Sequence, residues 1–349
     1  MEKKVSFTLA FFLCVLIVIP EVGHGADTKL FVFGDSYADT GNTPPVDGFQ
    51  CWEEPYGITF PGKPSGRFSD GRVLTDFIAE YLGIRSPVPY RGWKLGLNLQ
   101  NYGMNFAYGG TGVFNTINGG PNMTSQINDF QQLIQQRVFT KRDLSSSVAH
   151  VSAAGNDYGA LSVGGQKDIE SVISELVLNL KRIYSLGVPR ISVVAVPPFG
   201  CMPQDVVPIQ PSPCNESDNS FARLHNQLLK KAVEKLNTET GGSTFVILDL
   251  YSAFMYAFNV HNNRPGKSSF VNPWEECCKG RRSGSSCGDV DEDGRKEYVV
   301  CEDPKHSFFW DAIHPSQQGW LAVFSIVKPS LNTLFLPHAP LYLLAIIIM

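Results

Sequence analysis

Two stretches near opposite ends of the sequence carry polar residues that could do chemistry together. An apolar run over residues 30–33 ends abruptly in the triplet GDS, whose last residue is Ser36. Near the C-terminus, the segment FFWDAIHPS places Asp311 three residues before His314. A serine nucleophile needs a base to take its proton and a carboxylate to orient that base. Ser36, His314 and Asp311 could therefore transfer the acyl group of a carboxylic ester.

Acyl transfer also needs hydrogen-bond donors for the oxyanion that develops in the transition state. The segment NFAYGGTG at 105–112 contains Gly110, and the segment AAGND contains Asn156. A glycine lets the backbone approach a substrate closely, because no side chain blocks it. We expect the backbone N–H groups of Ser36 and Gly110 and the side-chain amide of Asn156 to converge. We also expect Ser36 to begin a helix, whose dipole would favour negative charge there.

Residues so far apart in the sequence can meet only if the fold brings their loops together. Short runs rich in Val, Ile and Phe predict strands. These runs are residues 29–35, 148–157, 190–198 and 243–250. Between them, apolar residues at steps of three and four predict helices. These are residues 72–82, 123–136, 167–186 and 219–236. The alternation indicates an α/β fold with a parallel sheet, which binds ligands beyond the carboxyl ends of its strands.

Two long segments interrupt this alternation. Residues 43–69, rich in Pro and Gly, follow the first strand, and residues 262–308, rich in Gly, Cys and charge, precede the last helix. Long loops in a compact domain are usually functional or cross-linked. We find no internal repeat and no linker between two cores, so we predict a single domain over residues 26–335. A hydrophobic content of 43% in 349 residues is sufficient for its core.

The blocks FGDSYADTGN, NFAYGGT, GND and DAIHP, in that order, make the chain resemble the plant GDSL esterase/lipase family of the SGNH hydrolase superfamily. The resemblance covers residues 29–331. It implies a three-layer, flavodoxin-like α/β/α fold that uses no metal or other cofactor. It assigns the four roles that name the superfamily, and the carboxylate of the triad, to Ser36, Gly110, Asn156, His314 and Asp311. The chain departs from the family name at Tyr37, which stands where that name has leucine.

Several of these residues allow a second interpretation. Gly109 stands beside Gly110 and could supply the amide in its place. Asp157, in the GND block, is an alternative partner for the histidine. Ser36 could simply cap a helix, as serines often do, and Asp311 could cap the last helix. The order of the four blocks favours the catalytic interpretation.

Three functions are compatible with these residues. The first is a secreted serine esterase or lipase that hydrolyses carboxylic esters through an acyl-enzyme. The second is a non-catalytic glycan- or lipid-binding protein on the same scaffold, and the third is a transacylase with the same triad. The partner would be a small-molecule, lipid or polysaccharide ester. A net charge of -4 without a long run of one sign argues against nucleic acid. No nucleotide-binding motif occurs.

The acidic run DVDEDG at 289–294 begins like a calcium-binding loop. Val300, however, occupies the twelfth position, where such a loop needs a bidentate glutamate. We interpret the run as a solvated acidic loop and predict no metal site.

The N-terminus predicts export from the cell. Two lysines precede an apolar run over 5–19, and small residues follow it, which indicates a cleaved signal peptide over residues 1–25. We therefore expect a secreted, extracellular protein. The sequons NMT and NES predict glycosylation at Asn122 and Asn215. The apolar tail at 336–349 is shorter than a membrane span and could be an anchor signal or pack on the domain. No stable membrane span is expected.

The cysteines fit an oxidising compartment, which favours disulfides over zinc. Of eight cysteines, Cys14 lies in the predicted signal peptide, which leaves seven. An odd number leaves at least one thiol unpaired or paired between chains. Cys201 and Cys214 would close a short Pro-rich loop. The four cysteines between 277 and 301 would staple the second long segment, and their pairing stays open.

Overall fold

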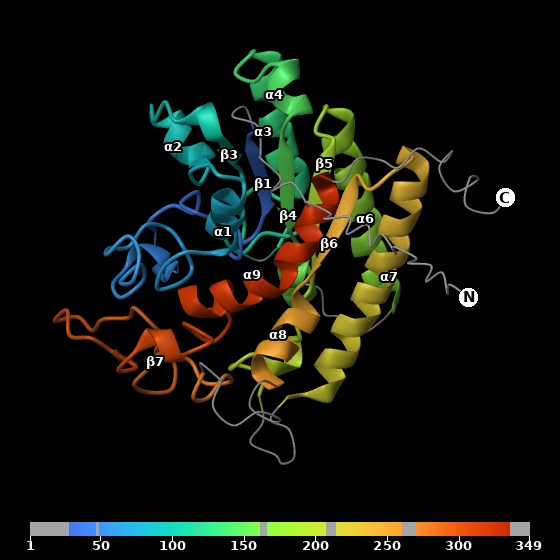
Figure 1. Ribbon diagram of the computed structural model, residues 1–349. Helices are drawn as coiled ribbons and strands as arrows, with labels where there is room; N and C mark the ends of the chain where they lie inside the picture. The colour runs from blue at the N-terminus through green and yellow to red at the C-terminus, as the bar shows by residue number, and fades with distance from the viewer. Residues whose placement is uncertain are drawn as a thin grey trace, which may run out of the picture.

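The computed structural model describes most of the chain between residues 28 and 335. The described stretches are residues 28–46, 49–116, 118–160, 166–206, 214–259 and 270–335. The predicted signal peptide at 1–25 and apolar tail at 336–349 lie outside the described residues. A central sheet with helices on both faces forms the described structure (Figure 1).

Six parallel strands form the central sheet of the described residues. Across the sheet they are β2 (Val88–Pro89), β3 (Gly103–Asn105), β1 (Leu30–Gly34), β4 (Val148–Ser152), β5 (Arg190–Ala195) and β6 (Phe245–Asp249). The four strands predicted from apolar runs are all present. The chain runs from β1 to β2 at one edge, returns through β3 beside β1, and then crosses to β4 on the other side of β1. The sheet therefore has a topological switch point at the carboxyl end of β1. Ser36 follows β1 and Asn156 follows the neighbouring β4, so both lie at this point.

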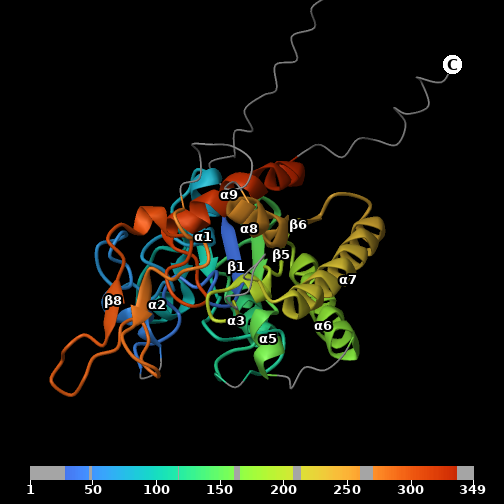
Figure 2. The same ribbon diagram turned by 90° about the horizontal axis from the view of Figure 1, so that it is seen from below.

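Helices cover both faces of the sheet, as Figures 1 and 2 show. One face packs against α1 (Leu74–Tyr81), α8 (Leu250–Asn259) and α9 (Gln317–Asn332). The other packs against α3 (Met123–Gln135), α6 (Gln166–Ser185) and α7 (Glu216–Thr240). Successive side chains of a strand point to opposite faces, so Leu30 and Val32 of β1 contact the first group and Phe31 and Phe33 the second. The three-layer α/β/α architecture is confirmed.

Capping side chains define where several helices begin. Asn122 caps α3 and Asn215 caps α7, in each case by accepting a backbone N–H of the first turn. Ser316 caps α9, because its Oγ accepts the N–H of Gly319 at 3.0 Å. Asp311 therefore does not cap the last helix. The shorter helices are α2 (Tyr90–Lys94), α4 (Lys141–Ser145) and α5 (Gly155–Ala160). None of the helices in the described residues is both long and apolar enough to cross a bilayer.

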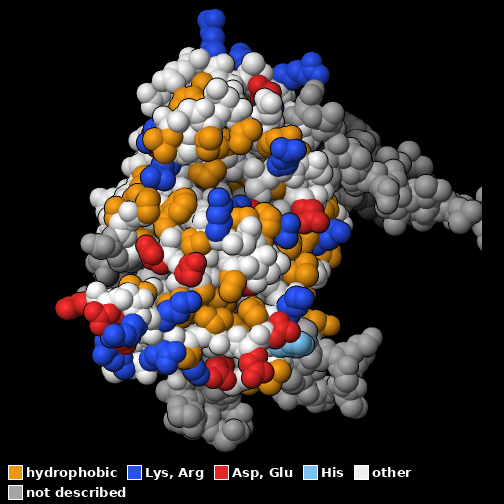
Figure 3. Space-filling model, turned by 90° about the vertical axis from the view of Figure 1, so that its left-hand side faces the viewer, with side chains coloured by type: hydrophobic (Ala, Val, Ile, Leu, Met, Phe, Trp, Pro, Cys, Tyr) orange, Lys and Arg blue, Asp and Glu red, His pale blue; other side chains and the backbone are white. Residues whose placement is uncertain are grey.

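Residues 270–307, which we call the lobe, form a disulfide-linked unit beside the sheet. Its short strands β7 (Cys278–Gly280) and β8 (Tyr298–Val300) pair antiparallel. Disulfides join Cys277 to Cys301 and Cys278 to Cys287, and a third joins Cys201 to Cys214. The predicted Pro-rich loop closure and the staple of the second long segment are both confirmed. Figure 3 shows side chains of both charge signs interspersed over the lower part of the face that carries the lobe.

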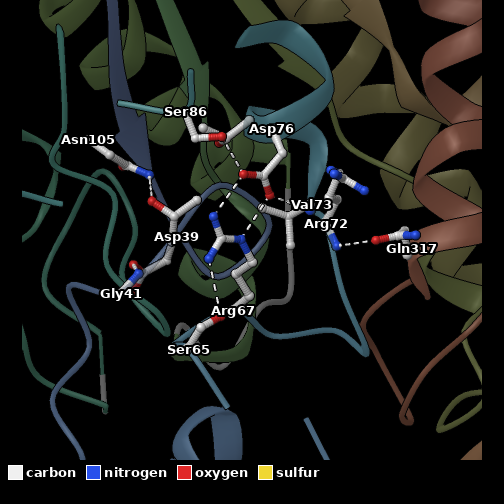
Figure 4. A network of polar contacts seen from close by, with 12 residues as sticks. Asp39, Gly41, Ser65, Arg67, Arg72, Val73, Asp76, Ser86, Asn105 and Gln317 are labelled. Carbon is white, nitrogen blue, oxygen red and sulfur yellow. Dashed lines mark hydrogen bonds and ion pairs between the residues drawn. The ribbon is translucent and has the colours of Figure 1, made fainter. Parts of the chain in front are cut away.

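The long segment 43–69 is held against α1 by a buried ion pair (Figure 4). Arg67 Nε donates to Asp76 Oδ2 at 2.9 Å, and Arg67 Nη2 donates to Asp76 Oδ1 at 2.8 Å. Asp76 also accepts the Val73 N–H at 2.9 Å and the Ser86 hydroxyl. Burial by itself would raise the pKa of Asp76, but Arg67 and these hydrogen bonds hold it below its usual value. The segment is therefore long but firmly anchored at its C-terminal end.

Cys51 is the one cysteine of the described residues that forms no disulfide. Its side chain is completely buried, and burial raises the pKa of its thiol. The cysteine without a disulfide partner is therefore a buried thiol inside the fold, which we call the sealed thiol.

Candidate active site

Ser36 lies in a tight turn at the carboxyl end of β1. Gly34 has a φ of +134°, and a Cβ there would lie 1.7 Å from the carbonyl oxygen of Ser152 on β4. Only a glycine allows the two backbones to approach so closely. Gln126 of α3 satisfies the Gly34 backbone, since its Oε1 accepts the N–H at 2.8 Å and its Nε2 donates to the carbonyl at 2.9 Å. These contacts fix the direction in which the chain presents Ser36.

The prediction that a helix begins at Ser36 is wrong. The N–H groups of Ala38 and Asp39 donate to the carbonyl of Asp35, which closes a single turn that no helix continues. The Asp39 carboxylate then accepts the N–H groups of the following residues, including that of Gly41 at 2.8 Å, and turns the chain away. Ser36 therefore neither caps a helix nor has a helix dipole behind it. Its backbone N–H has no acceptor among the described residues.

The structure brings Ser36, His314 and Asp311 into one hydrogen-bonded chain. Ser36 Oγ lies 2.9 Å from His314 Nε2. His314 Nδ1 lies 2.9 Å from each carboxylate oxygen of Asp311. The side chains of His314 and Asp311 are each 13% exposed. The imidazole ring also contacts Phe68 and Tyr37, with ring centroids 5.1 and 5.9 Å away. These rings restrict the orientation of the histidine.

The Asp311 carboxylate accepts hydrogen bonds from three groups besides the His314 ring. Its Oδ1 accepts the backbone N–H of Ile313 at 2.9 Å and of His314 at 2.7 Å. Its Oδ2 accepts the hydroxyl of Tyr56 at 2.7 Å. Burial by itself would raise the pKa of Asp311, but the charge and hydrogen bond of His314 and the two backbone donors hold it below its usual value. The carboxyl group is therefore ionised at neutral pH.

Asn156 is the second residue of α5 and lines the same cavity as Ser36. Its Nδ2 donates to the carbonyl of Thr111 at 3.0 Å, which uses one of its two amide protons. The bond holds the amide between the loops that follow β3 and β4. The second proton remains for a ligand.

The two adjacent glycines differ in what their backbones do. The Gly109 N–H donates to Asp39 Oδ2 at 3.1 Å and to Thr43 Oγ1 at 2.8 Å. The Gly110 N–H has no acceptor among the described residues. Gly110 is not itself a lining residue of the cavity, but a Cβ at this position would lie 2.7 Å from Nδ2 of Asn118, which is one. Of the two, Gly110 is the one with a free donor.

Asp157 does not orient the histidine. Its carboxylate accepts the N–H of Val113 at 3.0 Å and of Phe114 at 2.9 Å. A Cβ at Gly112 would lie 2.3 Å from this carboxylate, so the glycine makes room for it. Asp157 ties the loop after β3 to α5, and the alternative that pairs it with His314 is wrong.

Asp35 is a buried carboxyl group directly before Ser36. Its Oδ1 accepts the Tyr37 N–H at 3.1 Å and the Ser152 hydroxyl at 3.0 Å. Burial raises the pKa of Asp35 to about 7, although these hydrogen bonds and the charge of His314 act in the opposite direction. Perturbed carboxyl groups in clefts are typical of functional sites.

A cavity of about 790 Å³ opens beside Ser36 and Asn156. This volume is in the range of roughly 300–1,000 Å³ that small-molecule sites occupy. Much of its lining is apolar and includes Tyr158, Val194, Phe199, Phe221, Leu224 and Ile313. Three acidic residues, Asp35, Asp205 and Asp218, also line it. Burial and the charge of Asp218 raise the pKa of Asp205. The site therefore combines an apolar wall with negative charge.

A buried histidine supports the apolar wall from behind. The hydroxyl of Tyr158 contacts Nδ1 of His225 on α7. Burial lowers the pKa of His225 to about 3, so the ring is neutral at physiological pH. His150 on β4 is also buried, and burial lowers its pKa to about 3. Neither histidine can replace His314, because neither contacts Ser36.

Tyr56 is a site residue that the sequence does not reveal, because its contact with Asp311 spans 255 residues along the chain. No local pattern signals such a bond. Gln126 was also missed, although a polar residue on the apolar stripe of a helix is a detectable signal.

The sequence is similar to known proteins along most of its length. The family described as GDSL-like Lipase/Acylhydrolase matches residues 30–327. GDSL esterase/lipase At5g03610 of Arabidopsis thaliana is 47% identical, over 94% of this chain and 97% of that protein. GDSL esterase/lipase At3g09930 of the same plant is 48% identical, over 88% of this chain and 89% of that protein. A GDSL lipase of Tanacetum cinerariifolium is 29% identical, over 90% of this chain and 87% of that protein.

The family match spans the blocks that carry Ser36, Gly110, Asn156 and His314, and the two Arabidopsis relatives extend over nearly the full length of both chains. The chain belongs to the GDSL-like lipase/acylhydrolase family.

Proposed function

We propose that the protein is a serine esterase that hydrolyses carboxylic esters through a covalent acyl-enzyme. The observation that carries the proposal is the separation of 2.9 Å between Ser36 Oγ and His314 Nε2, with Asp311 at 2.9 Å behind the ring. A nucleophile, a base and an orienting carboxylate within hydrogen-bond reach are the parts that acyl transfer needs. Family membership supports the same class of reaction.

In the acylation step, Ser36 Oγ attacks the carbonyl carbon of the ester while His314 Nε2 takes the hydroxyl proton. The carbonyl oxygen becomes an oxyanion, for which the free N–H groups of Ser36 and Gly110 and the second amide proton of Asn156 are the available donors. The bond to the alcohol oxygen then breaks, and the imidazolium gives its proton to the departing alcohol. Asp311 holds the imidazole tautomer and stabilises the imidazolium.

In the deacylation step, water replaces the alcohol. His314 takes a proton from the water, whose oxygen attacks the acyl carbon, and the same donors face the second oxyanion. The bond to Ser36 Oγ breaks, and Oγ recovers its proton from His314. A carboxylic acid leaves the site.

The direct test is Ser36→Ala with p-nitrophenyl acetate as substrate. Hydrolysis should fall to the rate of the solution reaction, while the unfolding midpoint changes little. Ser217→Thr is the matched control, because Ser217 lines the same cavity without contacting the histidine and threonine keeps the sequon at Asn215. Full activity of Ser36→Ala would refute the assignment. A serine-directed phosphonate should label the wild-type chain, whereas a non-catalytic binding protein would not react.

We also propose that the apolar wall of the cavity receives the apolar part of the ester. Tyr158 and Phe221 pack edge to face with ring centroids 4.7 Å apart, and both line the cavity. Each CH₂ group that is fully buried contributes about 0.8 kcal/mol to binding. Esters with longer acyl chains should therefore be better substrates than acetates, up to the length that the cavity accommodates.

We further propose that the protein follows the secretory route and is glycosylated at Asn122 and Asn215. Three disulfides support an oxidising compartment. Both asparagines are half-buried helix caps whose side-chain oxygen accepts a backbone N–H. The Asn122 amide donates one proton to Asn115 Oδ1 at 2.8 Å, so its second proton is the one that a glycan would replace. Treatment with a peptide N-glycosidase should shift the mass of the protein purified from a eukaryotic host.

A further inference from the structure

Tyr56 reaches Asp311 from a distant part of the chain. Of the groups outside residues 311–314, the Tyr56 hydroxyl is the one donor to this carboxylate in the described structure, at 2.7 Å from Oδ2. The other donors are the His314 ring and the backbone N–H groups of Ile313 and His314. Those groups belong to the same short turn and move with it. Tyr56 is therefore the link that ties the carboxylate to the rest of the fold.

The hydroxyl of Tyr56 is a permanent donor. The residue is 4% exposed, and burial together with the charge of Asp311 raises the pKa of Tyr56 well above its usual value. Tyr56 is also absent from the lining of the cavity beside Ser36. The hydrogen bond to Asp311 is the contact through which Tyr56 reaches the triad.

Two independent parts of the fold hold the Tyr56 ring in place. Its own segment is fixed by the Gly57 N–H, which donates to the Ser69 carbonyl at 3.0 Å, and further along by the Arg67–Asp76 ion pair shown in Figure 4. The ring itself packs edge to face on Trp310, with centroids 6.0 Å apart.

The lobe supplies the other half of this support. Tyr56 and Trp310 form one buried cluster with Tyr298 and three disulfide-bonded cysteines, Cys277, Cys278 and Cys287. The N–H of Cys277 donates to the Phe309 carbonyl at 3.1 Å, and that of Cys278 donates to the Trp310 carbonyl at 2.7 Å. The lobe is thus fastened to the residues directly before Asp311.

We propose that Tyr56 is a positioning residue for the triad, and that the disulfide-linked lobe exists in part to hold its hydroxyl against Asp311. This inference rests on the proposed function. The phenol fixes Oδ2 so that the carboxylate stays aimed at His314 Nδ1. It also withdraws part of the carboxylate charge, which limits how tightly Asp311 holds the imidazolium.

The test is Tyr56→Phe, with Tyr298→Phe as the matched control. Tyr298 lies in the same cluster and is 3% exposed, but it does not contact Asp311. Removing a hydrogen bond to a charged group should lower kcat about tenfold in Tyr56→Phe, with KM within twofold. A carboxylate with one donor fewer holds the imidazolium more tightly, so the acid limb of kcat/KM should move up by about half a pH unit. Tyr298→Phe should behave like the wild type in both respects.

Ionisable groups other than Tyr56 also interact with Asp311 or His314. They are Asp35, Tyr37 and Glu276, which the substitution leaves in place, so a moved acid limb reports the lost phenol.

A double-mutant cycle separates positioning from general damage to the fold. In an Asp311→Ala background, Tyr56→Phe should change kcat by less than twofold, because the group through which it acts is gone. A second tenfold loss in that background would mean a structural role and would overturn the inference. So would an unchanged kcat and acid limb in the single variant. Activity that survives Ser36→Ala would instead overturn the proposed function, which keeps the two failures apart.

Discussion

Replacing Asp35 by asparagine should stabilise the protein in a pH-dependent way. The folded carboxyl has a pKa of about 7, against 3.8 for the unperturbed group. The folded state therefore binds the proton more tightly than the unfolded state, and stability falls as the pH rises from about 4 to about 7. The difference of roughly 3 pH units corresponds to about 4 kcal/mol of lost stability above pH 7. Asparagine has no charge to bury and keeps the oxygen that accepts from Tyr37 and Ser152.

The assay is urea unfolding of wild type and Asp35→Asn at a series of pH values from 4 to 8. The two free energies of unfolding should agree near pH 4. The variant should become more stable as the pH rises, by up to about 4 kcal/mol at pH 8. Asp293→Asn is the control, because this exposed carboxylate should change stability by less than about 1 kcal/mol at every pH. A difference that does not vary with pH, or a variant that is less stable at pH 8, would refute the reasoning.

Three further substitutions probe the site and its frame. Asn156→Ala should lower kcat by about 10²–10³ in steady-state hydrolysis of p-nitrophenyl acetate, because an oxyanion donor is lost; a change below threefold would remove Asn156 from that role. Phe221→Asp should reduce kcat/KM for an octanoyl ester at least tenfold and for the acetyl ester by less than threefold; equal losses on both esters would argue against an apolar acyl site. Gly34→Ala should destabilise the fold by about 1–3 kcal/mol or more in urea unfolding, because a Cβ would meet the Ser152 carbonyl, whereas Gly159→Ala has open space and should be nearly neutral. Equal stability of the two alanine variants would contradict this account.

The strands and the turn that position the site could be predicted, because each is marked by residues close together in the sequence. Apolar runs mark β1, β4, β5 and β6, and parallel strands deliver Ser36 and Asn156 to the same edge. Asp311 and His314 are three residues apart, so a single tight turn is enough to join them. Family resemblance supplied the pairing of this turn with Ser36.

The contacts that were mispredicted depend on packing between distant segments. A helix seemed to begin at Ser36 because the local residue types allow one, but the Asp39 carboxylate bonds to the next backbone N–H groups and to Gly109, 70 residues away. The choice between Gly109 and Gly110 followed from the same bond, which occupies the Gly109 N–H. Tyr56 meets Asp311 in a cluster to which the lobe contributes three disulfide-bonded cysteines. No pattern within one segment contains that information.

The sealed thiol of Cys51 has a practical consequence for oxidative folding. With the six partners at 201, 214, 277, 278, 287 and 301 already joined, a seventh reactive sulfur could attack any of these bonds and scramble them. Complete burial and a raised pKa keep this sulfur protonated and out of reach once the chain has folded. The same atom can then report on opening of the fold, because a thiol-reactive dye should add to Cys51 only as fast as the molecule opens.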